Sequence, residues 1–214
     1  MWKEGDTWYM GLNHFVEDVG GQVLLFKSKN LLEWEYMHQL CVGDYKITGR
    51  NWECSDFFPL GDKHVLIVSS HGEHRWSPPR YVAGWPFRST LTMVGTYKDH
   101  KFHPEIYGNT DYGGDLYAAR TLVDDRGRRI LIGWLWDEPR DRKYQFAAGW
   151  AGVMSLPRIL TLRPDNTLDF RPVPELQVLR GKHWRFENKS LADGTLEVLP
   201  GASGDCLEIL AEFE

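Results

Sequence analysis

The apolar residues of this chain occur in short runs that are rich in β-branched and aromatic side chains and are bounded by Gly, Asp, Asn or Pro. Such runs are typical of strands joined by tight turns. Helical periodicity is scarce, and a short helical turn is expected only around Pro174–Leu179, where proline suits the first helical position. The chain is therefore predicted to be all-β, with strands at Thr7–Leu12, Gln22–Lys27, His64–Ser69, Arg80–Trp85, Thr90–Lys98, Asp115–Val123 and Arg129–Trp136.

A turn followed by a strand recurs three times along the chain. The turns EGD at 4–6, LGD at 60–62 and DRG at 125–127 lead into TWYMGL, HVLIVS and RRILIGW. The spacing of roughly 55–65 residues suits four-stranded β-propeller blades once loops are allowed for. The segment SKNLLEWEYMHQL fits an outer blade strand with Trp34 and Tyr36 on one face. A β-sandwich with irregular hairpins is the alternative that this pattern leaves open.

The residue pattern of the sequence changes near residue 170. We expect residues 1–170 to form the propeller part, 171–185 a linker that opens with the proline-marked RPVPEL, and 186–214 the start of a β-sandwich. The last alternating run, DCLEILAEFE, has no returning strand, and the first residues begin inside a hairpin. Because a strand without a partner is an incomplete sheet, we expect the chain to be part of a longer protein.

Charge and composition argue against several classes of partner. With 25 Lys+Arg against 30 Asp+Glu, the formal net charge is −5, which argues against nucleic acid or an anionic membrane surface as the main partner. No run of about 18 apolar residues is present to span a membrane. The three cysteines, Cys41, Cys54 and Cys206, fit neither a disulfide framework nor a CxxC zinc site. With no phosphate-binding or dinucleotide motif, we expect no cofactor and no metal.

The most informative segment is NWECSDFFPL at 51–60. Glu53 lies between Trp52 and Cys54, with two phenylalanines close by. An apolar setting would raise the pKa of this carboxyl and keep it protonated near neutral pH, as a general acid requires. The alternative is that Glu53 faces water at a strand end while its neighbours pack.

Five segments, taken in order, resemble glycoside hydrolase family 32, which includes invertases, fructanases and levanases. WECSDFFPL resembles the family's WEC(P)DF motif, and YGGDLYAA at 112–119 resembles its DFYA segment. GRRILIGWLWDEP resembles its RRILxGW strand, GWAG with SLPR resembles its WAG…LPR pair, and RPVPELQVLR resembles its exit from the catalytic domain. The resemblance implies a five-bladed β-propeller followed by a β-sandwich.

The resemblance also implies a retaining hydrolase that cleaves the fructosyl bond of sucrose, a fructo-oligosaccharide or a fructan, with Glu53 as the general acid/base. The family's nucleophilic Asp in NDPNG and its stabilising Asp in RDP have no match in this sequence. RDP normally precedes a segment like the WKEGDTWYM with which the chain starts. We therefore expect both to be missing by truncation and the isolated chain to be inactive. A non-catalytic carbohydrate-binding propeller is the rival from another class.

Further residues are candidates for contact with the sugar, each with a structural alternative. Asp115 is expected to accept sugar hydroxyls and Tyr117 to border the site; a turn Asp and a packed strand Tyr are the alternatives. Trp134 stacks on a sugar ring or packs in the core, and Trp52 walls the site or fills the core. Cys54 shapes the surroundings of Glu53 or is a small buried hydrophobe.

Two other features of the motif region are weaker. Asp56 is a candidate for orienting the backbone of the motif. The segment HGEH at 71–74 places two imidazoles and a carboxylate together, but it is not HExxH and no helix supports it. We interpret it as an exposed loop and not a metal site.

Overall fold

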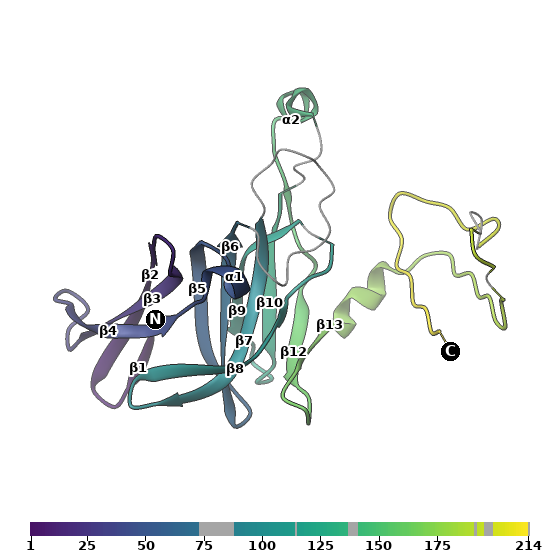
Figure 1. Ribbon diagram of the computed structural model, residues 1–214. Helices are drawn as coiled ribbons and strands as arrows, with labels where there is room; N and C mark the ends of the chain where they lie inside the picture. The colour runs from purple at the N-terminus through teal and green to yellow at the C-terminus, as the bar shows by residue number, and fades with distance from the viewer. Residues whose placement is uncertain (73–87, 114, 137–140, 191, 195–198, 214) are drawn as a thin grey trace. The chain divides into compact units, whose positions relative to one another are not determined.

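The computed structural model of the chain describes residues 1–72, 88–113, 115–136, 141–190, 192–194 and 199–213 (Figure 1). They fall into two compact units, Met1–Pro172 and Val173–Glu214. The first unit consists of three antiparallel sheets in chain order, so the all-β prediction is confirmed. The expected strand Arg80–Trp85 lies outside the described residues. No helix in the described part of the chain has the length and apolar character needed to cross a membrane.

Two of the sheets are up-and-down meanders of four strands, and the third has five strands. The first sheet has the order β1-β2-β3-β4 and the second β5-β6-β7-β8. In the third, β9, β10, β12 and β13 pair in sequence, and the short β11 pairs with the end of β10. The strands are β1 (Trp2–Glu4), β2 (Thr7–Val16), β3 (Gly20–Ser28), β4 (Glu35–Val42), β5 (Asn51–Leu60), β6 (Lys63–His71), β7 (Arg88–Lys98), β8 (Lys101–Asn109), β9 (Leu116–Val123), β10 (Arg129–Leu135), β11 (Val153–Met154), β12 (Arg158–Leu162) and β13 (Leu168–Pro172).

The repeat seen in the sequence is the hairpin between the first and second strands of each sheet. Gly5, Gly61 and Gly127 occupy these three turns, with φ of 54°, 62° and 74°. Only glycine adopts this left-handed backbone without a steric penalty, which is why the turn carries glycine each time. Three blade-like sheets of the same construction therefore follow one another along the chain.

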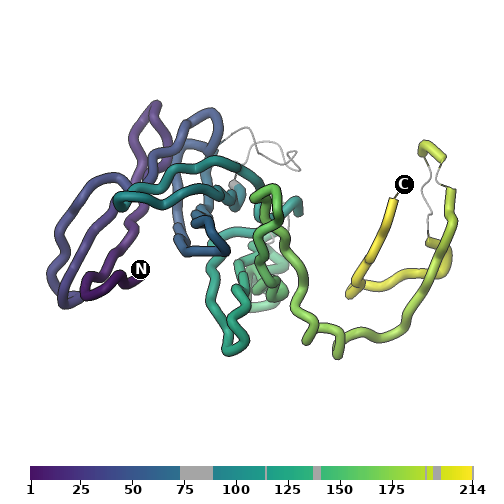
Figure 2. The backbone as a smooth tube through the Cα atoms, turned by 90° about the horizontal axis from the view of Figure 1, so that it is seen from below, coloured from purple at the N-terminus to yellow at the C-terminus, as the bar shows by residue number. Residues whose placement is uncertain are grey.

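Two apolar cores fill the spaces between neighbouring sheets, which lie side by side in chain order (Figures 1 and 2). On β6, Leu66 and Val68 join the core shared with the first sheet, and Val65 and Ile67 join the core shared with the third. Both faces of this strand are thus buried, which explains why HVLIV is a continuous apolar run and not an alternating one.

Several strands and two helices were not predicted. β5 and β8 carry Pro59 and Pro104, which interrupt the strand pattern, but both are edge strands of their sheet, where a missing N–H is tolerated. Trp34 precedes β4 and donates its indole N–H to the Leu31 carbonyl, so the expectation that it shares a strand face with Tyr36 is wrong. The helices α1 (Tyr45–Thr48) and α2 (Arg142–Ala148) are too short to give a periodic signal.

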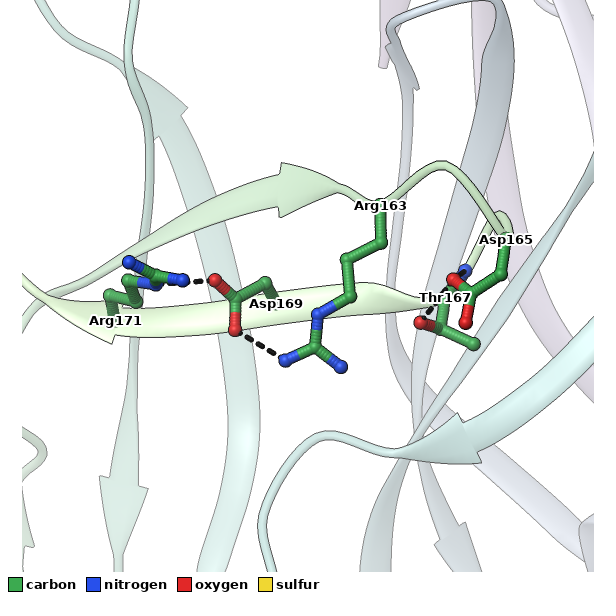
Figure 3. Close-up of polar contacts among 5 residues, drawn as sticks. All are labelled: Arg163, Asp165, Thr167, Asp169 and Arg171. Atoms are coloured by element: carbon green, nitrogen blue, oxygen red, sulfur yellow. Dashed lines mark hydrogen bonds and ion pairs between the residues drawn. The ribbon is translucent and has the colours of Figure 1, made fainter. Parts of the chain in front are cut away.

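The outer hairpin of the third sheet is held by charge pairs (Figure 3). Asp169 on β13 binds Arg163 at 2.7 Å and Arg171 at 2.5 Å. Burial raises the pKa of Asp169, but the hydrogen bonds from Arg171 and Arg163 outweigh it and hold the pKa below its ordinary value. In the turn, the Thr167 N–H and hydroxyl both donate to Asp165.

The second unit contains the 3₁₀ helix η1 (Pro174–Leu179), as predicted. Arg180, just after it, makes two hydrogen bonds to Glu208, at 2.5 and 3.0 Å. Within 180–190, 192–194 and 199–213 the structure assigns no strand. The linker at 171–185 and the sandwich start at 186–214 therefore stay predictions.

Candidate active site

The motif around Glu53 contains a β-bulge. Its pairing to β6 shifts between Glu53, opposite Ser69, and Asp56, opposite Ile67. Cys54 in this bulge has a φ of 50°, which is unusual for a side chain other than glycine. Asn13 of β2 supports this bulge. In the side-chain orientation that satisfies its hydrogen bonds, the Asn13 amide oxygen accepts the N–H groups of Cys54 (2.6 Å) and Ser55 (3.1 Å). A strained backbone held by a neighbouring sheet is typical of functional sites.

Trp52 lies in the core and not in the site. Its side chain is 1% exposed, and the indole packs against the backbone of Gly21 and Gly43, where a Cβ would lie 2.2 and 2.4 Å from ring atoms. Its N–H donates to the Thr48 carbonyl at 2.9 Å. Of the two interpretations of Trp52, the structure shows the core residue, so this side chain is not placed to contact a substrate. Since neighbouring residues on a strand face opposite ways, burial of Trp52 turns Glu53 outward.

The Glu53 carboxylate meets side chains from two other strands. The Tyr117 hydroxyl of β9 donates to Oε2 at 2.7 Å, and Nε2 of His71, the last residue of β6, lies 3.2 Å from the same oxygen. The Tyr117 oxygen and His71 Nε2 are themselves 2.5 Å apart. The Glu53 side chain is 46% exposed. Among the described residues, the two phenylalanines of the motif do not surround this carboxyl, because Phe57 packs with the first core and Phe58 belongs to the second.

An aromatic row borders this cluster. Tyr117 stacks on Trp136 with ring centroids 5.9 Å apart, and Trp136 meets Trp134 edge to face at 5.5 Å. Trp134 lies opposite Tyr117 in the β9–β10 register. Gly152 lies against the Trp134 indole, where a Cβ would be 2.0 Å from Nε1. The row joins Trp134, one of the sequence candidates, to the carboxylate through Tyr117.

Asp115 lies just before β9, and its carbonyl accepts the N–H of Trp136 at 3.3 Å. It lines a cavity of about 390 Å³, together with the Asp111–Arg158 ion pair of 2.7 Å. Glu53 is not among the residues that line this cavity. Asp115 therefore lines a cavity of which Glu53 is not part, two residues before the Tyr117 that contacts Glu53.

Cys54 and Asp56 are the other two candidates in the motif around Glu53. Burial raises the pKa of the half-buried Cys54 thiol; the Arg120 guanidinium opposes this shift and the Glu53 carboxylate adds to it. Asp56 accepts the N–H and the hydroxyl of Thr121, each at 2.7 Å. It therefore ties β5 to β9, whereas the sequence had suggested that it orients its own motif.

The sequence missed three residues of the cluster: His71, Trp136 and Asn13. His71 was assigned to an exposed loop, but it belongs to β6 and lies opposite Asn51; residues 73 and 74 lie outside the described part. Counting pairs back from the 61–62 turn would have placed His71 beside the motif, and Trp136, two residues after Trp134, shares its face. Nothing in the sequence pattern points to Asn13.

This arrangement is suited to proton transfer. A half-exposed carboxyl that accepts a hydrogen bond from a neighbouring hydroxyl can give and take a proton. Across the described residues, no three His, Cys, Asp or Glu side chains gather in a way that could hold a metal ion.

The family model for the N-terminal domain of glycosyl hydrolases family 32 matches residues 1–172. The sucrose-6-phosphate hydrolase of Zymomonas mobilis is 34% identical over 192 residues, covering 84% of this chain and 36% of that protein. That of Bacillus subtilis is 33% identical over 219 residues, covering 99% and 44%. The raffinose invertase of Escherichia coli is 31% identical over 191 residues, covering 85% and 37%. The chain thus spans less than half the length of these relatives.

Two solved structures resemble the fold. The β-fructofuranosidase of Bombyx mori, also solved in complex with sucrose, superposes with a TM-score of 0.70 at 31% identity, over 85% of this chain and 38% of that one. The fructan 1-exohydrolase IIa of Cichorium intybus has a TM-score of 0.66 at 23% identity, over 83% and 34%, and supports the fold alone.

Proposed function

The chain belongs to glycosyl hydrolase family 32, and from that premise we propose that it carries the general acid/base, Glu53, of an enzyme that cleaves the fructosyl bond of sucrose or a fructan. The observation that carries the proposal is the Glu53 carboxyl: half exposed, held at Oε2 by Tyr117 and His71, and bordered by an aromatic row. Relatives named as sucrose-6-phosphate hydrolase and raffinose invertase support the substrate class.

The proposed reaction is retaining glycoside hydrolysis. Glu53 protonates the glycosidic oxygen as a nucleophilic carboxylate attacks the anomeric carbon, and then takes a proton from the water that hydrolyses the glycosyl–enzyme intermediate. The two carboxyl groups stand roughly 5–5.5 Å apart in such enzymes. The nucleophile and the stabilising Asp come from segments that this sequence does not contain, since neither NDPNG nor RDP occurs in it.

The sugar is bound by the face that carries the aromatic row. Sugar rings present apolar C–H faces, which stack on aromatic side chains, and carboxylates accept their hydroxyls. Trp134 and Trp136 supply the stacking surface in this proposal and Asp115 accepts hydroxyls. The three blade-like sheets are three of five propeller blades, and residues 186–214 begin the sandwich that follows.

The test compares the isolated 214-residue chain with the polypeptide expressed from its complete reading frame, by reducing sugar released from sucrose and from inulin. We expect turnover only from the latter, and a loss of roughly 10²–10⁴-fold in kcat/KM for Glu53→Gln. Glu35→Gln, an exposed carboxylate on β4, is the matched control and keeps full activity.

Undiminished turnover in Glu53→Gln would overturn the role of Glu53. Turnover by the isolated chain that this substitution abolishes would overturn its expected inactivity. The rival of a non-catalytic carbohydrate-binding propeller is not favoured, because the relatives reported above are named as hydrolases.

A further inference from the structure

Two side chains meet at a single oxygen of Glu53. The Tyr117 oxygen lies 2.7 Å and His71 Nε2 3.2 Å from Oε2, and these two atoms contact each other. The three side chains come from β5, β6 and β9, so their meeting depends on the packing of the second sheet against the third. Tyr117 is 6% exposed and stacks on Trp136, which restricts movement of its hydroxyl.

The hydrogen count assigns the roles of these groups. A tyrosine hydroxyl has one proton, and here it points to the carboxylate. Its oxygen then acts as an acceptor for His71, so Nε2 of the imidazole carries a hydrogen. The order of donation is His71 Nε2–H to Tyr117 oxygen, and Tyr117 O–H to Glu53 Oε2.

We propose that His71 is a positioning residue for Glu53: acting through the Tyr117 hydroxyl, it keeps Oε2 as the hydrogen-bond acceptor, so that the transferable proton resides on Oε1. This inference rests on the proposed function of Glu53. In the first step the Oε1–H bond breaks and the proton goes to the glycosidic oxygen as its bond to the sugar breaks. In the second, a water proton goes to Oε1 while the water oxygen bonds to the anomeric carbon.

The Tyr117 donor, itself supported by the His71 N–H, stabilises the carboxylate that is left after the first step. Hydrogen bonds to the charged form of a carboxyl lower its pKa. Removing the His71 donor therefore raises the pH at which Glu53 loses its proton, and it moves the alkaline limb of the pH–rate profile upward. A residue that only packed the strand end would lower activity without moving that limb.

Other charged and titratable groups lie near these residues along the chain and must be kept apart from His71. Cys54 of β5 lies next to Glu53, and its thiol pKa is raised, chiefly by burial. Arg50 donates its backbone N–H to the His71 carbonyl, while its guanidinium pairs with Glu17 at 2.7 Å. Asp115 precedes Tyr117 by two residues. The variants below leave all of these in place.

The experiment uses the protein expressed from the complete reading frame, with sucrose as substrate. We expect His71→Leu to move the alkaline limb of kcat/KM upward by about one pH unit. His71→Gln, which retains an N–H donor, moves it by less than half as much. His103→Leu, an exposed histidine on the outer strand β8, is the matched control and leaves the limb in place. In a Tyr117→Phe background, only the direct 3.2 Å contact of His71 with Oε2 remains. The shift that His71→Leu gives there measures that contact, and we expect it to be smaller than the shift in the parent protein by the part that acts through Tyr117.

An unchanged limb in His71→Leu, or equal shifts in the Leu and Gln variants, would overturn the role of His71. The same shift is measured without turnover from the pH titration of the ¹³C carboxyl resonance of Glu53, assigned by its loss in Glu53→Gln. A shifted titration in a protein that does not cleave sucrose or inulin supports the positioning role and counts against the proposed function. Cleavage of sucrose together with an unchanged titration of Glu53 in His71→Leu supports the proposed function and counts against the positioning role of His71.

Discussion

Replacing Gly21 with alanine is expected to destabilise the chain severely, because its position leaves no room for a methyl group. A Cβ on Gly21 would lie 2.2 Å from Cγ, 2.3 Å from Cδ1 and 2.6 Å from Cδ2 of Trp52. The indole cannot retreat: its far edge is against Gly43, and its N–H is bonded to the Thr48 carbonyl.

Overpacking a closed core costs about 1–3 kcal/mol, and three ring atoms inside normal contact distance place Gly21→Ala at the upper end, at about 3 kcal/mol. For a chain of this size, 1 kcal/mol lowers the melting temperature by roughly 2–4 °C, so we expect a fall of roughly 6–12 °C. A shifted Trp52 also moves Glu53, the next residue, away from Tyr117.

The measurement is thermal unfolding followed by circular dichroism. Gly108→Ala is the matched control, since Gly108 also lies in a strand but its Cβ would meet only Thr92 Oγ1, at an ordinary 3.5 Å. We expect that variant to unfold within a few degrees of the wild-type chain. Equal melting temperatures for the two alanine variants would refute the argument that Trp52 is locked in place.

Three further outcomes follow from the structure. Asp56→Ala is expected to lower the free energy of unfolding, measured in urea, by about 2 kcal/mol, because the N–H and the hydroxyl of Thr121 lose a charged acceptor. The control Asp62→Ala, at an exposed position, is expected to change it by no more than about 0.5 kcal/mol. Equal losses in the two variants would contradict the role of Asp56 in joining the second sheet to the third. The lowered pKa of Asp169 stabilises the fold above the ordinary Asp pKa, and this contribution is lost as pH falls through the folded value. Asp169→Asn should therefore flatten the loss of melting temperature below about pH 4, and an unchanged slope counts against it. Iodoacetamide, followed by mass spectrometry, should label exposed Cys206 before Cys54, whose thiol is half-buried with a raised pKa; the reverse order would refute this.

Much of the fold was predictable because its signals are local. The glycine turns at Gly5, Gly61 and Gly127, the strands around them and the helical turn at Pro174–Leu179 each depend on a few consecutive residues. Strands with an internal proline, β5 and β8, and helices of one or two turns were missed, since their patterns are interrupted or too short.

The candidate site was predictable only in part. Glu53, Tyr117 and Trp134 were named from motifs, and the structure links them through hydrogen bonds and ring contacts. For Trp52, the sequence leaves two interpretations open, a wall of the site or a core residue, and the structure shows the core residue. The interpretation of His71 as part of a loop is wrong, because it does not count the strand pairs from the 61–62 turn, which carry β6 to the level of Asn51.

The sequence by itself therefore determined the class of fold, the order of its hairpins, the family to which the chain belongs and the importance of Glu53 in it. Tertiary structure decided which residues meet. Glu53 and Tyr117 are 64 positions apart, and their contact depends on the bulge at Cys54 and on the packing of the second sheet against the third. In a strand, one added residue reverses the faces of all that follow, so a bulge held by a distant amide, here Asn13, decides which side chains reach the site.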